Sequence, residues 1–169
     1  MRRSLLPALL VLLVCLLRGG PAFAVGENCS VVATPLAFGN FAPLSGTVLD
    51  VTSTVTVTCT CSVLCLGINY TVAVSFGGSG TFSPRRMSAG TPKLPYNGYT
   101  TAARTTVWGD GTGSTAMPAR CRLAGAIGSS WVEPITFYGR IPVSTGIAPG
   151  SYTDSLTVTV TYNGLSLCL

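Results

Sequence analysis

The cysteines are the residues with the most distinctive chemistry in this 169-residue chain. Beyond the first 24 residues there are six of them, at Cys29, Cys59, Cys61, Cys65, Cys121 and Cys168. The start of the chain has the pattern of an export signal, and an even number of cysteines in an exported chain favours disulfides. A metal site at the central three cysteines is the alternative, but the chain has no histidine and their spacing matches no common zinc pattern. We therefore predict disulfides and no metal centre.

Side chains that commonly act in catalysis are few. Histidine, the commonest general base, is absent. The five carboxylates are far apart in the sequence, at Glu27, Asp50, Asp110, Glu133 and Asp154. The glycine-rich stretch 109–113 would suit phosphate only at a strand-to-helix junction, and no amphipathic helix pattern follows it. The sequence therefore predicts no enzyme, no cofactor and no small-molecule substrate.

The first 24 residues have the three parts of a secretory signal peptide. Arg2 and Arg3 come first, an apolar run extends from Leu5 to Leu17, and Ala22-Phe-Ala24 forms a small-residue cleavage site. We expect the mature protein to begin at residue 25, as one domain over residues 25–162 followed by a tail at 163–169.

Removing the signal peptide lowers the positive charge of the chain. The whole sequence has a net charge of +5. Without Arg2, Arg3 and Arg18, seven basic residues face five acidic ones, which leaves a net charge of +2. Nucleic-acid binding needs a basic surface that such a chain lacks. We expect an exported protein with no nucleic-acid partner.

The rest of the chain has the pattern of short strands. Alternation of apolar and small polar residues predicts strands near residues 29–38, 51–59, 68–76, 96–99, 105–108, 135–141 and 155–162. Turn signals separate these stretches, residues 114–130 read as a long loop, and no convincing helix pattern follows residue 24. About seven strands of this kind predict an all-β sandwich. The last strand is the clearest, with one apolar face made of Leu156, Val158, Val160 and Tyr162.

Seven short motifs occur in order over residues 29–162, and the last of them leads into the final alternating strand. They are Cys29 with Phe38-Gly-x-Phe-x-Pro43, Val55-Thr-Val-Thr-Cys59, Arg86-Met87, Tyr96-Asn-x-Tyr99 with Arg104-Thr105, Trp108-Gly-Asp-Gly111, Tyr138-Gly-Arg-Ile-Pro142 and Gly150-x-Tyr152-x-Asp154. In these motifs the chain resembles the spore coat protein U domain family, which includes the pilin subunits of archaic (Csu-type) chaperone–usher pili.

The resemblance implies an immunoglobulin-like, pilin-type sandwich whose last strand is missing or incomplete. A periplasmic chaperone would fill the gap first, and the donor strand of a neighbouring pilin subunit would replace it during assembly at an outer-membrane usher. Leu156, Val158, Val160 and Tyr162 would line this donor-strand groove. The resemblance also implies a bridge between Cys29 and Cys59, and leaves the pairing of the other cysteines open.

The predicted mature chain departs from the family at its start. Only residues 25–28 would precede Cys29, too few for a donor segment, so a tip or minor position in a surface fibre is expected. The alternative is a non-polymerising, secreted spore-coat or cell-surface structural protein of the same fold.

The C-terminal tail and two apolar loops raise two further expectations. Asn163-Gly164 is a hairpin signal, and a hairpin would place residues 165–169 along the last strand, with Cys168 opposite Thr159. The competing arrangement is a tail held by Cys168. A second hypothesis is a contact pole for adhesion or for docking a partner, made of Val63, Leu64, Leu66 and Ile68 on one loop, and Ala126, Ile127, Trp131 and Val132 on another. The alternative is that these side chains only cap the core.

Overall fold

The computed structural model describes residues 26–62, 67–123, 127–163 and 168. These residues form eight strands: β1 (Glu27–Ala33), β2 (Leu49–Cys61), β3 (Gly67–Val74), β4 (Arg85–Ser88), β5 (Lys93–Tyr99), β6 (Ala119–Leu123), β7 (Ser130–Ile141) and β8 (Val158–Asn163). Two 3-10 turns, η1 (Pro43–Ser45) and η2 (Gly77–Ser79), are the only helical elements among them. No helix in the described part of the chain is long and apolar enough to cross a membrane.

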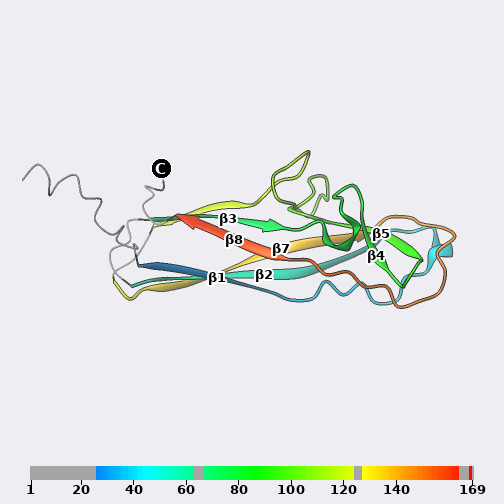
Figure 1. The fold of residues 1–169 in the computed structure, drawn as a ribbon, viewed down its shortest axis with the longest axis horizontal. Coiled ribbons are helices and arrows are strands. Elements are labelled where there is room, and N and C mark those ends of the chain that lie inside the picture. Colours follow the sequence, from blue (N-terminus) through cyan, green and yellow to red (C-terminus); the bar gives the residue numbers. More distant parts are fainter. Residues whose placement is uncertain (1–25, 63–66, 124–126, 164–167, 169) are drawn as a thin grey trace, which may run out of the picture.

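The strands form two antiparallel sheets, which confirms the predicted all-β sandwich. The larger sheet has the order β1-β2-β7-β5-β4, and the smaller has the order β6-β3-β8. Figure 1 shows β3 and β8 lying over β1, β2 and β7, with β4 and β5 at one end of the molecule. The main core lies between these layers.

Alternation along β2 and β3 builds this core. Val55, Val57 and Cys59 of β2 are buried, while the threonines between them face outward. Trp108 is fully buried against them, although it lies outside the strands. Its indole Nε1 donates a hydrogen bond to the carbonyl oxygen of Val72 at 2.8 Å, so the loop that carries Trp108 is fixed to β3.

Several strand boundaries differ from the predicted ones. β6 lies within residues 114–130, where we expected a loop, and β4 was not expected. The predicted strand at 105–108 is reduced to isolated bridges at Val107 and Trp108. Alternation extends back to residue 155, but β8 begins at Val158, because its partner β3 ends at Val74, level with Val158.

Arg85 of β4 is a charged residue inside the sandwich. Its side chain is fully buried, and its guanidinium donates to the carbonyl oxygens of Ser75, Val74 and Trp108 at 2.9, 3.3 and 2.7 Å. A fourth hydrogen bond, of 2.8 Å, reaches Oδ1 of Asn97. Arg85 therefore ties the end of β3 to β4, β5 and the Trp108 loop.

Candidate functional site: an open sheet edge

β8 is an edge strand, which pairs with β3 alone among the described residues. One position beyond the paired residues Val74 and Val158, the Ser75 N–H donates a hydrogen bond to the carbonyl oxygen of Thr157 at 2.9 Å. Ser75 and Thr157 are therefore a hydrogen-bonded pair. In an antiparallel ladder such pairs alternate with non-bonded ones. The next bonded pairs are therefore at Thr159 and Thr161, and the N–H and C=O groups of Val158, Val160 and Tyr162 point away from β3 to the open edge.

The same three residues turn their side chains toward the other sheet. In the pairing with β3, Val158 lies opposite Val74, Val160 opposite Val72, and Tyr162 opposite Tyr70, all three of which are buried. Val158 and Val160, like Leu156 before the strand, are half-buried and pack on the core, whereas Tyr162 is 39% exposed. β8 thus presents backbone hydrogen-bonding groups and an apolar row along one unpaired edge.

A cavity of about 360 Å³ lies between β8 and the larger sheet. Residues from both sheets line it, including Leu36, Phe38, Tyr96, Phe137, Leu156 and Val158. A second cavity, of about 750 Å³, adjoins it and shares Leu36, Phe38, Met87 and Tyr152. The start of β8, at Val158, therefore borders the first, mainly apolar cavity, whereas Val160 packs on the core.

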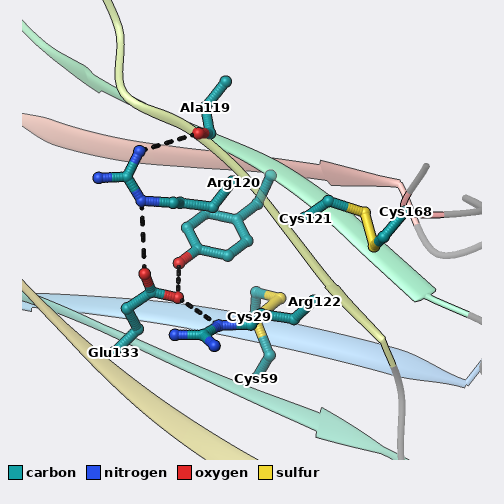
Figure 2. Close-up of polar contacts among 9 residues, drawn as sticks. Cys29, Cys59, Ala119, Arg120, Cys121, Arg122, Glu133 and Cys168 are labelled. Carbon is teal, nitrogen blue, oxygen red and sulfur yellow. Dashed lines mark hydrogen bonds and ion pairs between the residues drawn. A yellow bond between two sulfur atoms is a disulfide. The ribbon is translucent and has the colours of Figure 1, made fainter.

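The opposite side of the sandwich is closed by a polar cluster, drawn in Figure 2. Glu133 of β7 accepts hydrogen bonds from the Tyr70 hydroxyl of β3 at 2.6 Å and from Arg122 Nε of β6 at 2.9 Å. Arg120 Nε lies 3.4 Å from its second oxygen. These contacts join the two sheets on the side away from β8. The groove side has no comparable cluster among the described residues.

The pKa of Glu133 makes this cluster testable. Burial alone would raise that pKa, but the hydrogen bonds from Tyr70 and Arg122 and the charges of Arg122 and Arg120 outweigh it and lower the pKa below 4.5. A lowered folded-state pKa stabilises the fold above the unfolded pKa, and this contribution is lost as pH falls through the folded value.

We therefore predict that Glu133→Gln lowers the free energy of unfolding at pH 7, and that this difference from the wild type shrinks below about pH 4.5. Urea unfolding of both proteins at pH 7, 5 and 3 measures it. A difference that is the same at pH 7 and pH 3 would contradict the assigned role of the cluster.

Four of the five acidic residues have structural partners. Asp50 accepts a two-point contact from Arg140, Asp110 binds Thr112, and Asp154 accepts hydrogen bonds from Tyr96 and the Gly78 backbone. With Glu133, these side chains hold loops and strands together. Glu27 of β1 differs, because its Oε1 is buried and has no hydrogen-bond partner.

The structure contains the predicted Cys29–Cys59 disulfide. The two residues face each other in the pairing of β1 with β2, with Cα atoms 4.1 Å apart, and both side chains are buried. Cys61 is also disulfide-bonded. A further disulfide joins Cys121 of β6 to Cys168, as Figure 2 shows.

The Cys121–Cys168 disulfide bears on the predicted hairpin. β6 and β8 lie on opposite sides of β3, and Cys121 is level with Asn69, four residues from the partner of Thr159. Strand spacings of about 4.8 Å and rises of about 3.3 Å per residue separate Cys121 from Thr159 by about 16 Å. The Cα atom of Cys168 is 5.4 Å from that of Cys121.

Cys168 is therefore not opposite Thr159, as the hairpin would require. The disulfide favours the competing arrangement, a tail held by Cys168 at β6. The other residues of the predicted hairpin strand, 165–167 and 169, lie outside the described residues, as does Gly164 in its turn.

The predicted contact pole is described only in part. Val63, Leu64, Leu66 and Ala126 lie outside the described residues. Ile127 and Val132 are 70% and 62% exposed, whereas Trp131 is half-buried and packs on the core. The expectation for Ile68 was wrong: it is fully buried in β3, because it lies on the inward face of that strand, in line with Tyr70.

Sequence reasoning also missed residues that shape the groove. Leu36 and Phe38 line both cavities, although they follow β1 in a segment with no strand pairing. Pro35 explains this, because a proline cannot donate to a strand ladder. The signal in the sequence was the pair of apolar residues, Leu36 and Phe38, that directly follows Pro35.

Comparisons with known proteins found a matching family model and similar solved structures. A model of the Spore Coat Protein U domain matches residues 21–159. The fold is also similar to a chain of the crystal structure of the CsuC–CsuE chaperone–tip adhesion subunit pre-assembly complex, from archaic chaperone-usher Csu pili of Acinetobacter baumannii. That match has 21% sequence identity and a TM-score of 0.51, and covers 79% of this chain but only 39% of the other. No curated protein matches the chain.

Proposed function

Because this chain belongs to the Spore Coat Protein U domain family, as its motifs predicted, we propose that it is a structural subunit of a chaperone–usher surface fibre. The observation that carries the proposal is the unpaired edge of β8 beside the apolar cavity. An exposed strand edge of this kind is a template for another strand. We propose that the donor strand of a neighbouring subunit pairs with β8 and places alternate side chains in the groove.

The partners follow from this groove. Before assembly, a periplasmic chaperone would occupy the groove. At an outer-membrane usher, the donor strand of a neighbouring subunit would then replace the chaperone. The similarity to a protein crystallised with its chaperone supports the chaperone partner. Export through the periplasm to the cell surface is part of the same proposal.

Val160 and Thr159 offer a matched test on one strand. Val160 faces the groove and Thr159 faces solvent. We expect Val160→Asp to lower the fibre-bound fraction of the exported protein about tenfold or more. The donor strand would bury the new carboxylate among apolar side chains, which is energetically costly. Thr159→Asp should change that fraction less than about twofold, as is usual for a surface site.

The measurement is the fibre-bound fraction divided by the total exported amount, so that poor export is not counted as poor assembly. Val160→Thr, of nearly the same shape, serves if the aspartate variant is not exported. Equal incorporation of all variants would exclude the fibre proposal. Exported protein that never joins another chain would instead favour the non-polymerising coat protein.

The finer proposal is a tip or minor position. β1 begins at Glu27, close to the predicted cleavage point after residue 24, so a mature chain cut there carries no donor segment. Mass spectrometry of protein taken from fibres should find an N-terminus at residue 25. A start ten or more residues earlier would leave room for a donor strand and would contradict this position.

A further inference from the structure

Glu27 is the first residue of β1, and its carboxylate oxygen Oε1 is buried without a hydrogen-bond partner. It is opposite Cys61 in the pairing of β1 with β2, and two residues from Cys29, both of which are buried, so its side chain is on the inner face of β1. β1 is the edge strand of the larger sheet and lies close to β8, the edge strand of the smaller sheet. A buried carboxylate oxygen without a hydrogen-bond donor is costly and requires an explanation.

The described part of the chain supplies no cation for Glu27. Five of its seven basic side chains have other partners: Arg85 in the core, Arg104 and Arg140 at Asp50, and Arg120 and Arg122 at Glu133. The other two, Arg86 and Lys93, are on β4 and β5, which Figure 1 places at the opposite end of the sandwich from the start of β1.

Two other buried polar atoms also lack partners, Ser129 Oγ and Trp131 Nε1. Both belong to the start of β7 or the residue before it, and β2 separates β7 from β1. They lie away from the open edge, so Glu27 is the unsatisfied group that an incoming strand would meet.

The other end of β1 lies beside an apolar cavity. Ala33, six residues after Glu27 on β1, lines the 360 Å³ cavity together with Leu36, Leu156 and Val158. Six residues of strand span about 20 Å, and residues an even number apart share a face. One extended segment can therefore face both Glu27 and the cavity with side chains six positions apart.

We propose that the segment which fills this groove carries a lysine or arginine opposite Glu27, and a bulky apolar side chain six positions away, in the cavity. The proposal rests on the proposed function and adds the chemistry by which this subunit selects its partner. Charge complementarity fixes the position of the strand along the groove, because a shift by two residues separates the cation from Glu27.

Synthetic peptides test the proposal directly. Each is ten residues long, with threonine at outward positions and with Lys, Val, Val and Phe at successive inward positions. Two further peptides have Ala or Glu in place of Lys, and a fourth has Ala in place of Phe. All are made in both chain directions, because the new strand can run parallel or antiparallel to β8.

Fluorescence anisotropy with the exported, otherwise intact protein gives the affinities. In the better-binding direction, we expect the Lys peptide to bind about tenfold more tightly than the Ala peptide, and the Glu peptide to bind most weakly. In the Glu27→Gln protein the Lys and Ala peptides should bind within about twofold of each other. The Ala-for-Phe peptide should bind more weakly to both proteins.

The outcomes separate the two proposals. Equal binding of the Lys, Ala and Glu peptides to the wild-type protein would overturn the proposed role of Glu27 and leave the groove intact. Binding of none of the peptides would overturn the donor-strand function itself. The comparison of peptides on the wild-type protein needs no variant, so it holds even if Glu27→Gln fails to fold.

Discussion

Replacement of Arg85 with methionine should lower the free energy of unfolding by about 3–5 kcal/mol, the loss typical for removing one partner from a buried charged network. Methionine fills much of the same space but donates no hydrogen bond. Three carbonyl oxygens would then lose this buried donor, whereas Oδ1 of Asn97 would keep its hydrogen bond from the Gly98 N–H. Each unsatisfied buried group costs about 1–3 kcal/mol, which is consistent with this total.

Arg86→Met is the matched control. Arg86 is the next residue of β4 and is exposed, so the same substitution should cost less than about 0.5 kcal/mol. Guanidinium chloride unfolding of the three proteins gives the values. A loss at Arg85 no larger than the loss at Arg86 would show that the guanidinium does not hold β3, β4 and β5 together.

The second large effect concerns the Cys29–Cys59 disulfide. Replacing both cysteines with alanine should lower the free energy of unfolding by about 3–4 kcal/mol, since the bond closes a loop of about 30 residues in the unfolded chain. The bond also holds β1, the groove wall that carries Glu27, to β2. Its loss should therefore weaken donor binding as well as stability.

Ser30 and Thr58 provide the control for this pair. They face each other one residue along the same two strands, on the exposed side. Replacing both with alanine should cost less than about 1 kcal/mol. Denaturant unfolding under non-reducing conditions compares the two double variants. A cysteine variant as stable as the wild type would contradict the predicted contribution.

The main strands could be predicted because their signal is local. β2, β3 and β7 alternate over many residues, and one face of each is buried. β4 and β6 are short and rich in arginine, so nothing in their composition indicates a strand. They exist because β5 and β3 offer them a partner, and such pairing depends on distant residues.

The groove was predictable in part. The apolar row of β8 is evident in the sequence, and so is the missing neighbour that the family resemblance implies. The cavities and the unsatisfied Glu27 were not, because they depend on how Leu36, Phe38 and β1 lie across from β8. Likewise, the turn signal at Asn163-Gly164 is local, whereas the Cys121–Cys168 bond joins residues 47 positions apart.

Backbone amide exchange along β8 tests the central claim most directly. The claim is that the N–H groups of Val158, Val160 and Tyr162 point to an open edge, whereas those of Thr159 and Thr161 are bonded to β3. In the free protein we expect rapid exchange at the first three and slow exchange at the two threonines. Addition of a donor peptide should slow exchange at Val158, Val160 and Tyr162 without changing the threonines. Slow exchange at all five positions before any peptide is added, or rapid exchange at the three edge positions after a bound peptide saturates the protein, would contradict the account.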